Sequence, residues 1–171
     1  MHGLQHLALM RFAIFIAAIV TSSWACAQPV PLKEQLPGWA SKAWTHAANT
    51  HGLDIFGGVN PFMQRGDFDG DGKADLAILV QARSTKKIGI LFLHRNGKPL
   101  LVGAGFPLGN AGDDFSWLDI WAVEDRESIR SSDSQKSLKL KTDAVMVAKE
   151  GSAGGLIYFS GGKYKWQQHG D

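Results

Sequence analysis

The period of the apolar positions changes near Gly52, from the spacing of a helix to that of strands. Before Gly52, apolar side chains recur on one helical face: Trp39, Ala43, Trp44 and Ala47. This spacing predicts one helix over about 38–50, with Gly52 as its C-terminal stop. We expect the two tryptophans of this helix to cover one face of a sheet, because an amphipathic helix buries its apolar stripe.

After Gly52, short apolar runs are separated by turn residues, which is the pattern of a mainly β chain. The predicted strands are 59–66, 76–81, 88–94, 100–103, 120–123, 138–141, 144–149, 156–160 and 163–167. The run 90–94 is almost entirely apolar and is expected to be central in its sheet. Alternating polar and apolar residues in 138–141 and 163–166 indicate half-exposed strands.

Two dipeptides between predicted strands favour tight hairpins. Asn96-Gly97 and Gly161-Gly162 both accept positive φ at the two central positions of a two-residue turn. The stretch 124–137 is polar and has no apolar period, so we expect a long exposed loop there. Together the elements predict a mainly β fold of the α+β type, with antiparallel sheet and one N-terminal helix.

The first residues have the pattern of a secretory signal peptide and are set apart from the fold. Arg11 precedes a short apolar run, 12–20, and the segment ends at Ala27 in a small-residue cleavage pattern. The run is shorter than the ~20 residues that a membrane span needs. We therefore predict a signal peptide over 1–27, export to the periplasm or the cell exterior, and no membrane span.

Cleavage after Ala27 would leave residues 28–171, which we expect to fold as a single domain. Cys26 is the one cysteine of the chain, so this domain would have no disulfide although its compartment permits them. The alternative is a lipoprotein with Cys26 as the lipidated residue. Ser23 stands where such signals usually carry a Leu-like residue.

The composition narrows the class of partner. Of the 171 residues, 44% are hydrophobic, and the formal net charge is only +2. Such a composition is typical of a globular domain. Because neither a basic excess nor a basic stripe is present, we expect no nucleic-acid partner.

The stretch RGDFDGDGKADLAILV, over 65–80, carries an unusual density of acid. Counted from the first acid, positions 1, 3, 5 and 9 are Asp67, Asp69, Asp71 and Asp75. Glycines at positions 4 and 6 allow reversals that turn the carboxylates toward one centre, which the carbonyl of Lys73 at position 7 would join. Carboxylates this close repel one another unless a cation or solvent screens them.

We predict that this loop binds Ca²⁺ through Asp67, Asp69, Asp71, Asp75 and the carbonyl of Lys73. Ca²⁺ takes six to eight oxygen ligands at ~2.3–2.6 Å, whereas Mg²⁺ prefers a strict octahedron and keeps its waters. The loop holds no cysteine or histidine, which disfavours softer metals. We expect a structural ion whose binding is coupled to folding. The alternative is a solvated acidic turn with no metal.

The loop differs from an EF-hand in two ways. Ile78 stands at position 12 in place of a bidentate Glu, and a strand-like run follows Asp75 in place of a helix. Residues 67–76 match the pattern D-x-D-G-D-G-x-x-D-φ and resemble the calcium-binding loops of FG-GAP and VCBS-type repeats. The resemblance covers roughly 59–81. It implies a calcium site between two strands and a partial, propeller-like sheet.

A second unusual segment, 109–121, mixes acids with aromatic residues: Asp113, Asp114, Trp117, Asp119 and Trp121. One interpretation is a loop that presents these side chains to a protein or glycan partner. The other is a turn whose acids cap the backbone and whose aromatics pack into the core. None of the six histidines is interpreted as a metal ligand.

The chain also resembles small secreted bacterial proteins that carry one D-x-D-G-D-G loop and a G-D-D-F-S-W segment, here 112–117. That resemblance implies no particular activity. We expect an exported, non-catalytic calcium-binding module that binds a protein or glycan of the cell envelope, for example as an inhibitor or immunity protein of a cell-wall hydrolase. The alternative is a secreted carbohydrate-active hydrolase that uses Asp113, Asp114 or Asp119 as paired acids.

Overall fold

The computed structural model describes residues 30–126, 129–130, 137–138, 140–152 and 154–169. The predicted signal peptide and Cys26 lie outside this part of the chain. A 3-10 helix, Leu32–Gln35, leads into the helix α1, Gly38–His51. The positive φ of Gly52 ends α1, and the Gly52 N–H donates to the carbonyl of Ala48. The predicted helix and its stop are confirmed.

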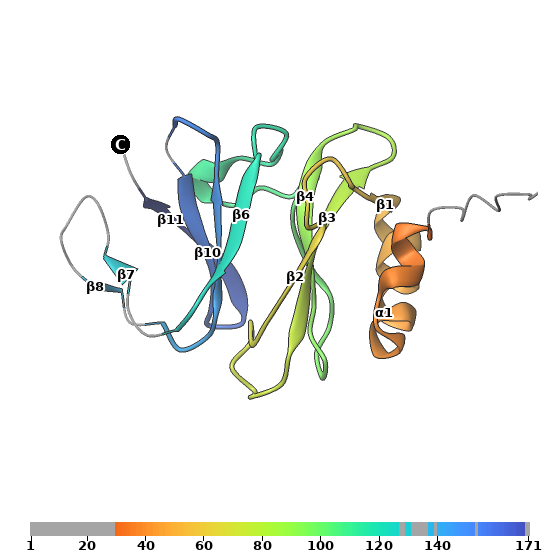
Figure 1. Cartoon of the computed structure of the whole chain (residues 1–171), viewed down its shortest axis with the longest axis horizontal. Helices are drawn as coiled ribbons and strands as arrows, with labels where there is room; N and C mark the ends of the chain where they lie inside the picture. Colours follow the sequence, from red (N-terminus) through yellow and green to blue (C-terminus); the bar gives the residue numbers. More distant parts are fainter. Residues whose placement is uncertain (1–29, 127–128, 131–136, 139, 153, 170–171) are drawn as a thin grey trace, which may run out of the picture.

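Two antiparallel sheets follow α1 (Figure 1). The first sheet has the order β1-β3-β4-β5, and β2 pairs with the other half of the same edge of β3. Its strands are β1 Leu53–Ile55, β2 Met63–Gly66, β3 Asp75–Ala82, β4 Ile88–Leu93 and β5 Leu100–Gly103. β4 lies between β3 and β5 and is buried throughout, as predicted for a central strand.

The second sheet has the order β11-β10-β9-β6. Its strands are β6 Ile120–Glu124, β9 Ala144–Ala148, β10 Gly154–Ser160 and β11 Lys163–His169. A 3-10 helix, Gly109–Ala111, lies between the two sheets in the sequence, and a small ribbon pairs β7 Ile129–Arg130 with β8 Ser137–Leu138. The mainly β class with one α-helix is therefore confirmed. A propeller has about four to eight blades, whereas the described residues form two sheets and this ribbon.

Helix, first sheet and second sheet form three layers, and β3 is buried on both faces. Leu76, Ile78 and Val80 point to the helix side, where they pack with Trp44. Ala77 and Leu79 alternate to the other side and pack with residues of the second sheet. Side chains of a strand point alternately to opposite faces, so a strand between two cores must be apolar at nearly every position. This explains the continuous apolar run after the aspartates.

The interior between the two sheets is rich in aromatic residues. Phe92 of β4 stacks on Tyr164 of β11, with ring centroids 3.7 Å apart. Phe68, from the aspartate loop, meets Phe92 edge-on at 5.4 Å and is fully buried. A buried aromatic side chain contributes strongly to stability through its large apolar area. The aspartate loop is thus anchored in the main core by its second residue.

Several sequence predictions are corrected by the structure. The predicted strand 138–141 ends at Leu138, and Leu140 instead packs against Ala144 and Leu156. The Asn96-Gly97 turn is not a tight hairpin, because neither residue has positive φ and the strands end at Leu93 and begin again at Leu100. By contrast, Gly161 and Gly162 have φ of +66° and +80° and join paired strands as predicted.

Three further boundaries differ. The strand predicted from 59 begins only at Met63, since Pro61 has no N–H to give to a neighbour. β1 was not predicted, because three residues are too few to show alternation. The predicted loop 124–137 contains the short pairing of β7 with β8, and 131–136 lie outside the described residues.

Candidate metal centre

The aspartate loop closes a hairpin between β2 and β3. Gly66 lies opposite Asp75 in the antiparallel register, so the loop joins neighbouring strands, as predicted. Gly70 and Gly72 have φ of +83° and +81°, a conformation that costs other residues about 1–2 kcal/mol. The predicted reversals therefore occur at the two glycines that the pattern requires.

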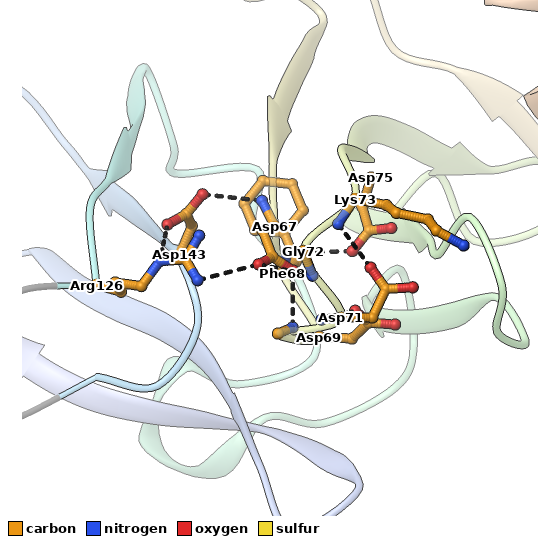
Figure 2. A network of polar contacts seen from close by, with 10 residues as sticks. Asp67, Phe68, Asp69, Asp71, Gly72, Lys73, Asp75, Arg126 and Asp143 are labelled. Carbon is orange, nitrogen blue, oxygen red and sulfur yellow. Dashed lines mark hydrogen bonds and ion pairs between the residues drawn. The ribbon is translucent and has the colours of Figure 1, made fainter.

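Backbone N–H groups hold the carboxylates in place (Figure 2). Asp67 accepts hydrogen bonds from the N–H groups of Gly70 at 2.8 Å and Gly72 at 3.1 Å. Asp69 accepts from the N–H of Asp71 at 3.1 Å, and Asp71 accepts from the N–H of Lys73 at 2.8 Å. Such short-range bonds pre-order an acidic turn. The carboxylates are held by the turn itself, although Asp71 lies at its exposed side.

The carboxylate oxygens form two groups that could hold a metal ion. One oxygen from each of Asp67, Asp69 and Asp71 lies within 4.8 Å of the others. Asp69 and Asp75 form a second group with His94, within the same 4.8 Å limit. Two ligands of one ion at about 2.4 Å are at most about 4.8 Å apart. Asp69 belongs to both groups and lies at the middle of the site.

Asp75 is the most deeply buried of the four acids, with no exposed surface. Its Oδ2 accepts from the N–H of Phe68 at 3.1 Å and its Oδ1 from the N–H of Arg95 at 2.8 Å. Burial raises the pKa of Asp75, and the Arg95 hydrogen bond offsets only part of this while the charge of Asp69 adds to it. A positive charge at the site would therefore favour the ionised carboxylate.

His94 is a residue that sequence reasoning did not assign to the site. It follows β4, it is buried, and its Nε2 lies 2.8 Å from the hydroxyl of Tyr164. Burial, followed by the charges of Asp75 and Asp69, raises the pKa of Tyr164, so this hydroxyl stays protonated. The position of His94 at the end of the predicted strand 88–94 gave no sign of this role, because the contact depends on how β4 and β11 face each other.

Asp143, just before β9, connects the loop to the second sheet. Its Oδ2 accepts from the N–H of Asp67 at 2.8 Å, and its own N–H donates to the carbonyl of Asp67 at 2.9 Å. Arg126 lies 3.1 Å from Asp67 Oδ2 and 3.5 Å from Asp143 Oδ1 (Figure 2). These partners are far apart in the sequence, and no local pattern pointed to them.

Asp71 and Lys73 lie at the exposed side of the loop. Asn96 donates to Asp71 Oδ2 at 2.7 Å, which brings the β4–β5 connection to the site. Lys73 takes part through its N–H, and its side chain is exposed. Coordination by the Lys73 carbonyl stays a prediction.

Two hollows open beside Asp69. One, of about 390 Å³, also lies against Thr142 and Tyr158. The other, of about 500 Å³, lies against Asp71 and His94. A cation and its waters can therefore reach the acidic cluster from the surface.

Four of the five residues predicted to face a partner serve the fold. Asp113 pairs with Lys87, and Asp119 Oδ1 accepts from the N–H of Glu150 at 2.7 Å. Asp114 accepts from the N–H groups of Ile88 and Ser116 and from the Ser116 hydroxyl.

The two tryptophans of this segment differ. Trp121 is only 5% exposed, and its Nε1 donates to the carbonyl of Pro61 at 2.7 Å. Trp117 is half-buried and lines a surface cavity. Partner binding by these five residues stays a prediction, and of the two tryptophans it is Trp117 that lies open to a ligand.

Comparisons with known proteins leave the site to be interpreted from its own geometry. No family model matches the chain, and no curated protein or solved structure matches it either. Among the described residues, no helix has the length and apolar character to cross a membrane.

Proposed function

We propose that this chain is an exported, non-catalytic, calcium-binding β module that binds a protein or glycan of the cell envelope. Ca²⁺ would be held by Asp67, Asp69, Asp71 and Asp75 with the carbonyl of Lys73. The observation that carries the proposal is the position of Asp69, which is shared by two groups of potential ligands in a loop hydrogen-bonded to both sheets.

The balance of charge favours a bound cation. Five carboxylates gather at the loop: Asp67, Asp69, Asp71, Asp75 and Asp143. In the described part of the chain, Arg126 is the one cationic side chain that forms ion pairs with them, and it reaches only two. Carboxylates in a partly buried site repel one another much more strongly than in water. A divalent cation would remove most of that repulsion.

The ligand set favours Ca²⁺ over other metals. All four loop side chains offer oxygen, and a backbone carbonyl is the expected fifth ligand. Ca²⁺ accepts the irregular geometry of such a loop, whereas Mg²⁺ demands a near-ideal octahedron. His94 would lie at the edge of the site, beside Asp75 and Asp69.

Thr142 supports a hydrated ion at this place. Its side chain is buried, and its hydroxyl has no hydrogen-bond partner within the described residues. Thr142 also lies against the same hollow as Asp69. Buried polar groups without a protein partner are commonly satisfied by ordered water, and Ca²⁺ keeps waters among its ligands.

The structural uses of Asp113, Asp114 and Asp119 favour binding over hydrolysis. Each of these carboxylates holds a lysine or a backbone N–H group of the fold. A glycoside hydrolase needs two free carboxyl groups that face each other across a substrate. An inhibitor or immunity protein of a cell-wall hydrolase is the form of binding module that we propose to test first.

The cation is tested by isothermal titration of the purified protein with Ca²⁺ and, separately, with Mg²⁺. We expect Ca²⁺ binding, a melting temperature that rises with Ca²⁺ and falls with chelator, and weaker Mg²⁺ binding. Asp69→Asn should lower Ca²⁺ affinity by at least about tenfold, because it removes a ligand from both groups. Asp113→Asn, outside the loop, is the matched control. No Ca²⁺ heat together with an unchanged melting temperature would refute the proposal.

The partner is tested with purified cell-wall hydrolases on labelled peptidoglycan. We expect the protein to slow a muramidase or an amidase, and Asp69→Asn to do so less well at limiting Ca²⁺. If every enzyme of such a panel hydrolyses peptidoglycan at an undiminished rate, the proposal that the protein is a hydrolase inhibitor is refuted.

A further inference from the structure

A surface cavity separate from the two hollows beside Asp69 lies at the other end of the second sheet from the aspartate loop. β10 begins at Gly154, which lines this cavity, and ends at Ser160, which lines the hollow beside Asp69. Seven residues of strand at about 3.3 Å each place the two sites about 20 Å apart. In Figure 1 the β9–β10 turn lies at the top of the sheet and the β2–β3 loop at the bottom.

Two tryptophans form the walls of this cavity, which has a volume of about 210 Å³. Trp117 and Trp166 meet edge to face, with ring centroids 6.4 Å apart and planes at 77°. Both are half-buried, so part of each indole remains open. Four polar residues also line it: Asn110, Lys149, Ser152 and Gln168.

The rings are held in place by the fold. A Cβ at Gly155 would lie only 2.3 Å from the six-membered ring of Trp166, so this ring lies directly on the strand. Trp166 Nε1 donates to Gln168 Oε1 at 3.3 Å. Trp117 packs on the fully buried Phe115 at 5.9 Å. Two fixed aromatic surfaces reduce the ordering cost of binding.

The polar groups around the rings are free to bind a ligand. Within the described residues, the side chains of Asn110, Lys149 and Ser152 form no hydrogen bond or ion pair with the protein. Gln168 accepts the Trp166 hydrogen bond through its Oε1, and its amide nitrogen remains available to a ligand. Hydroxyl, amide and ammonium groups thus surround an apolar surface, as in sites that recognise small molecules.

We propose that the cavity lined by Trp117 and Trp166 binds a pyranose ring of an envelope glycan. The C–H face of a sugar would pack on indole, and its hydroxyls would meet Asn110, Ser152 and Gln168. Among the described residues that line the cavity, Lys149 is the only charged one, so neutral and acidic sugars fit and a cationic ligand is repelled. This separates the site from an aromatic cage for a quaternary ammonium group.

This inference rests on the proposed function for the role of partner binding, but it shares no residue with the cation site. Its test is titration of the purified protein with cellohexaose, chitohexaose and hexagalacturonate, followed by heat and by tryptophan fluorescence. We expect at least one oligosaccharide to bind and to change the fluorescence. Choline is titrated in parallel, and saturable choline binding would overturn the sugar assignment.

Variants localise the binding. Trp117→Ala should lower the affinity for the oligosaccharide by at least about tenfold, and Asn110→Ala should lower it by at least about threefold. Trp166→Phe keeps an aromatic ring on Gly155, so it should lower the oligosaccharide affinity less than Trp117→Ala does. Phe106→Ala is the matched control, because Phe106 is an aromatic residue that is 45% exposed outside the cavity. Equal affinity in all variants would overturn the inference.

Repeating the titrations in chelator separates this inference from the proposed function. Ca²⁺ binding without any oligosaccharide binding would refute the sugar site alone. Oligosaccharide binding in a protein that takes up no Ca²⁺ would refute the cation site alone. One further outcome would assign the cavity to a protein partner. In that case the wild type inhibits a hydrolase, Trp117→Ala does not, and no oligosaccharide binds. The sugar assignment would then be wrong.

Discussion

At the scale of single residues, the aspartates of the loop have two uses. Their carboxylates accept backbone N–H groups, which shape the turn, and they also place oxygens close enough together to share an ion. A carboxylate oxygen has lone pairs for both. These hydrogen bonds restrict the conformations of the turn, and such a restriction reduces the ordering cost of binding a cation.

Arg126 competes with a cation at Asp67. Its guanidinium lies 3.1 Å from Asp67 Oδ2, a predicted ligand. We expect Arg126→Gln to raise Ca²⁺ affinity by about threefold to tenfold, because a like charge next to the ion is removed. Titration at low and high salt measures this, and the gain should shrink at high salt. Lys42→Gln, which removes an exposed cation of α1 away from the site, is the control. Weaker Ca²⁺ binding in Arg126→Gln would contradict the prediction.

Thr142 reports whether water occupies the site. With no partner for its hydroxyl, Thr142→Val should leave stability unchanged or raise it by about 1 kcal/mol in chelator. With saturating Ca²⁺, loss of a hydroxyl that meets a bound water should lower stability by a similar amount. Urea unfolding under both conditions gives the two differences, and the same difference in each would show that Thr142 does not contact the hydrated ion.

At the level of secondary-structure elements, turns and loops hold both the candidate ligands and the hydrogen bonds that fix these segments to the fold. The β2–β3 hairpin could be predicted because its glycines and its apolar strand lie next to each other in the sequence. For the segment around Asp114, the capping role of the acids could be predicted, but the distant backbone group that Asp114 holds could not. Its acids cap the backbone, as one of the two interpretations held, but one of the groups that Asp114 holds is the N–H of Ile88, at the start of β4.

Asp114→Ala should destabilise the protein by about 1–3 kcal/mol at pH 7, because an ionised acceptor of two N–H groups is lost. Burial by itself would raise the pKa of Asp114, but the hydrogen bonds from Ile88 and Ser116 and the charge of Lys87 outweigh it and lower the pKa. A lowered pKa stabilises the fold above the unfolded value of about 3.9, and this contribution is lost as pH falls through the folded value.

The gap in unfolding free energy between wild type and Asp114→Ala should therefore narrow below about pH 4. Denaturant unfolding over a pH series measures the gap. Asp113→Ala is the matched neighbour, since its ion pair with Lys87 is half-exposed and worth at most about 1 kcal/mol. A constant gap down to pH 2 would contradict the assigned role of the Asp114 charge.

At the scale of the whole molecule, the aspartate loop is a junction. Its strands belong to the first sheet, its Phe68 lies in the core between the sheets, and its first residue exchanges two hydrogen bonds with Asp143 at the start of β9. An ion bound there would stabilise the contact between sheets as well as the hairpin. Binding free energy of this kind appears as folding stability.

Ca²⁺ should therefore slow amide hydrogen exchange in β9 and β10 as well as in β2 and β3. In Asp143→Ala the ion should still bind, but its protection should be confined to the first sheet. Exchange measured by mass spectrometry with and without Ca²⁺ tests this, and titration confirms that the variant is loaded. Equal protection of the second sheet in wild type and Asp143→Ala would show that the ion does not act through this contact.

The helix and its stop at Gly52, the strand after the aspartates, and the place and reversals of the loop could all be predicted from the sequence. These features depend on residues that are neighbours in the chain, so periodicity and glycine spacing suffice to reveal them. Only the tertiary structure brought His94, Arg126 and Asp143 to the loop and Trp166 to Trp117. Their contacts arise from the packing of two sheets, and a local pattern holds no information about which distant side chains that packing will place together.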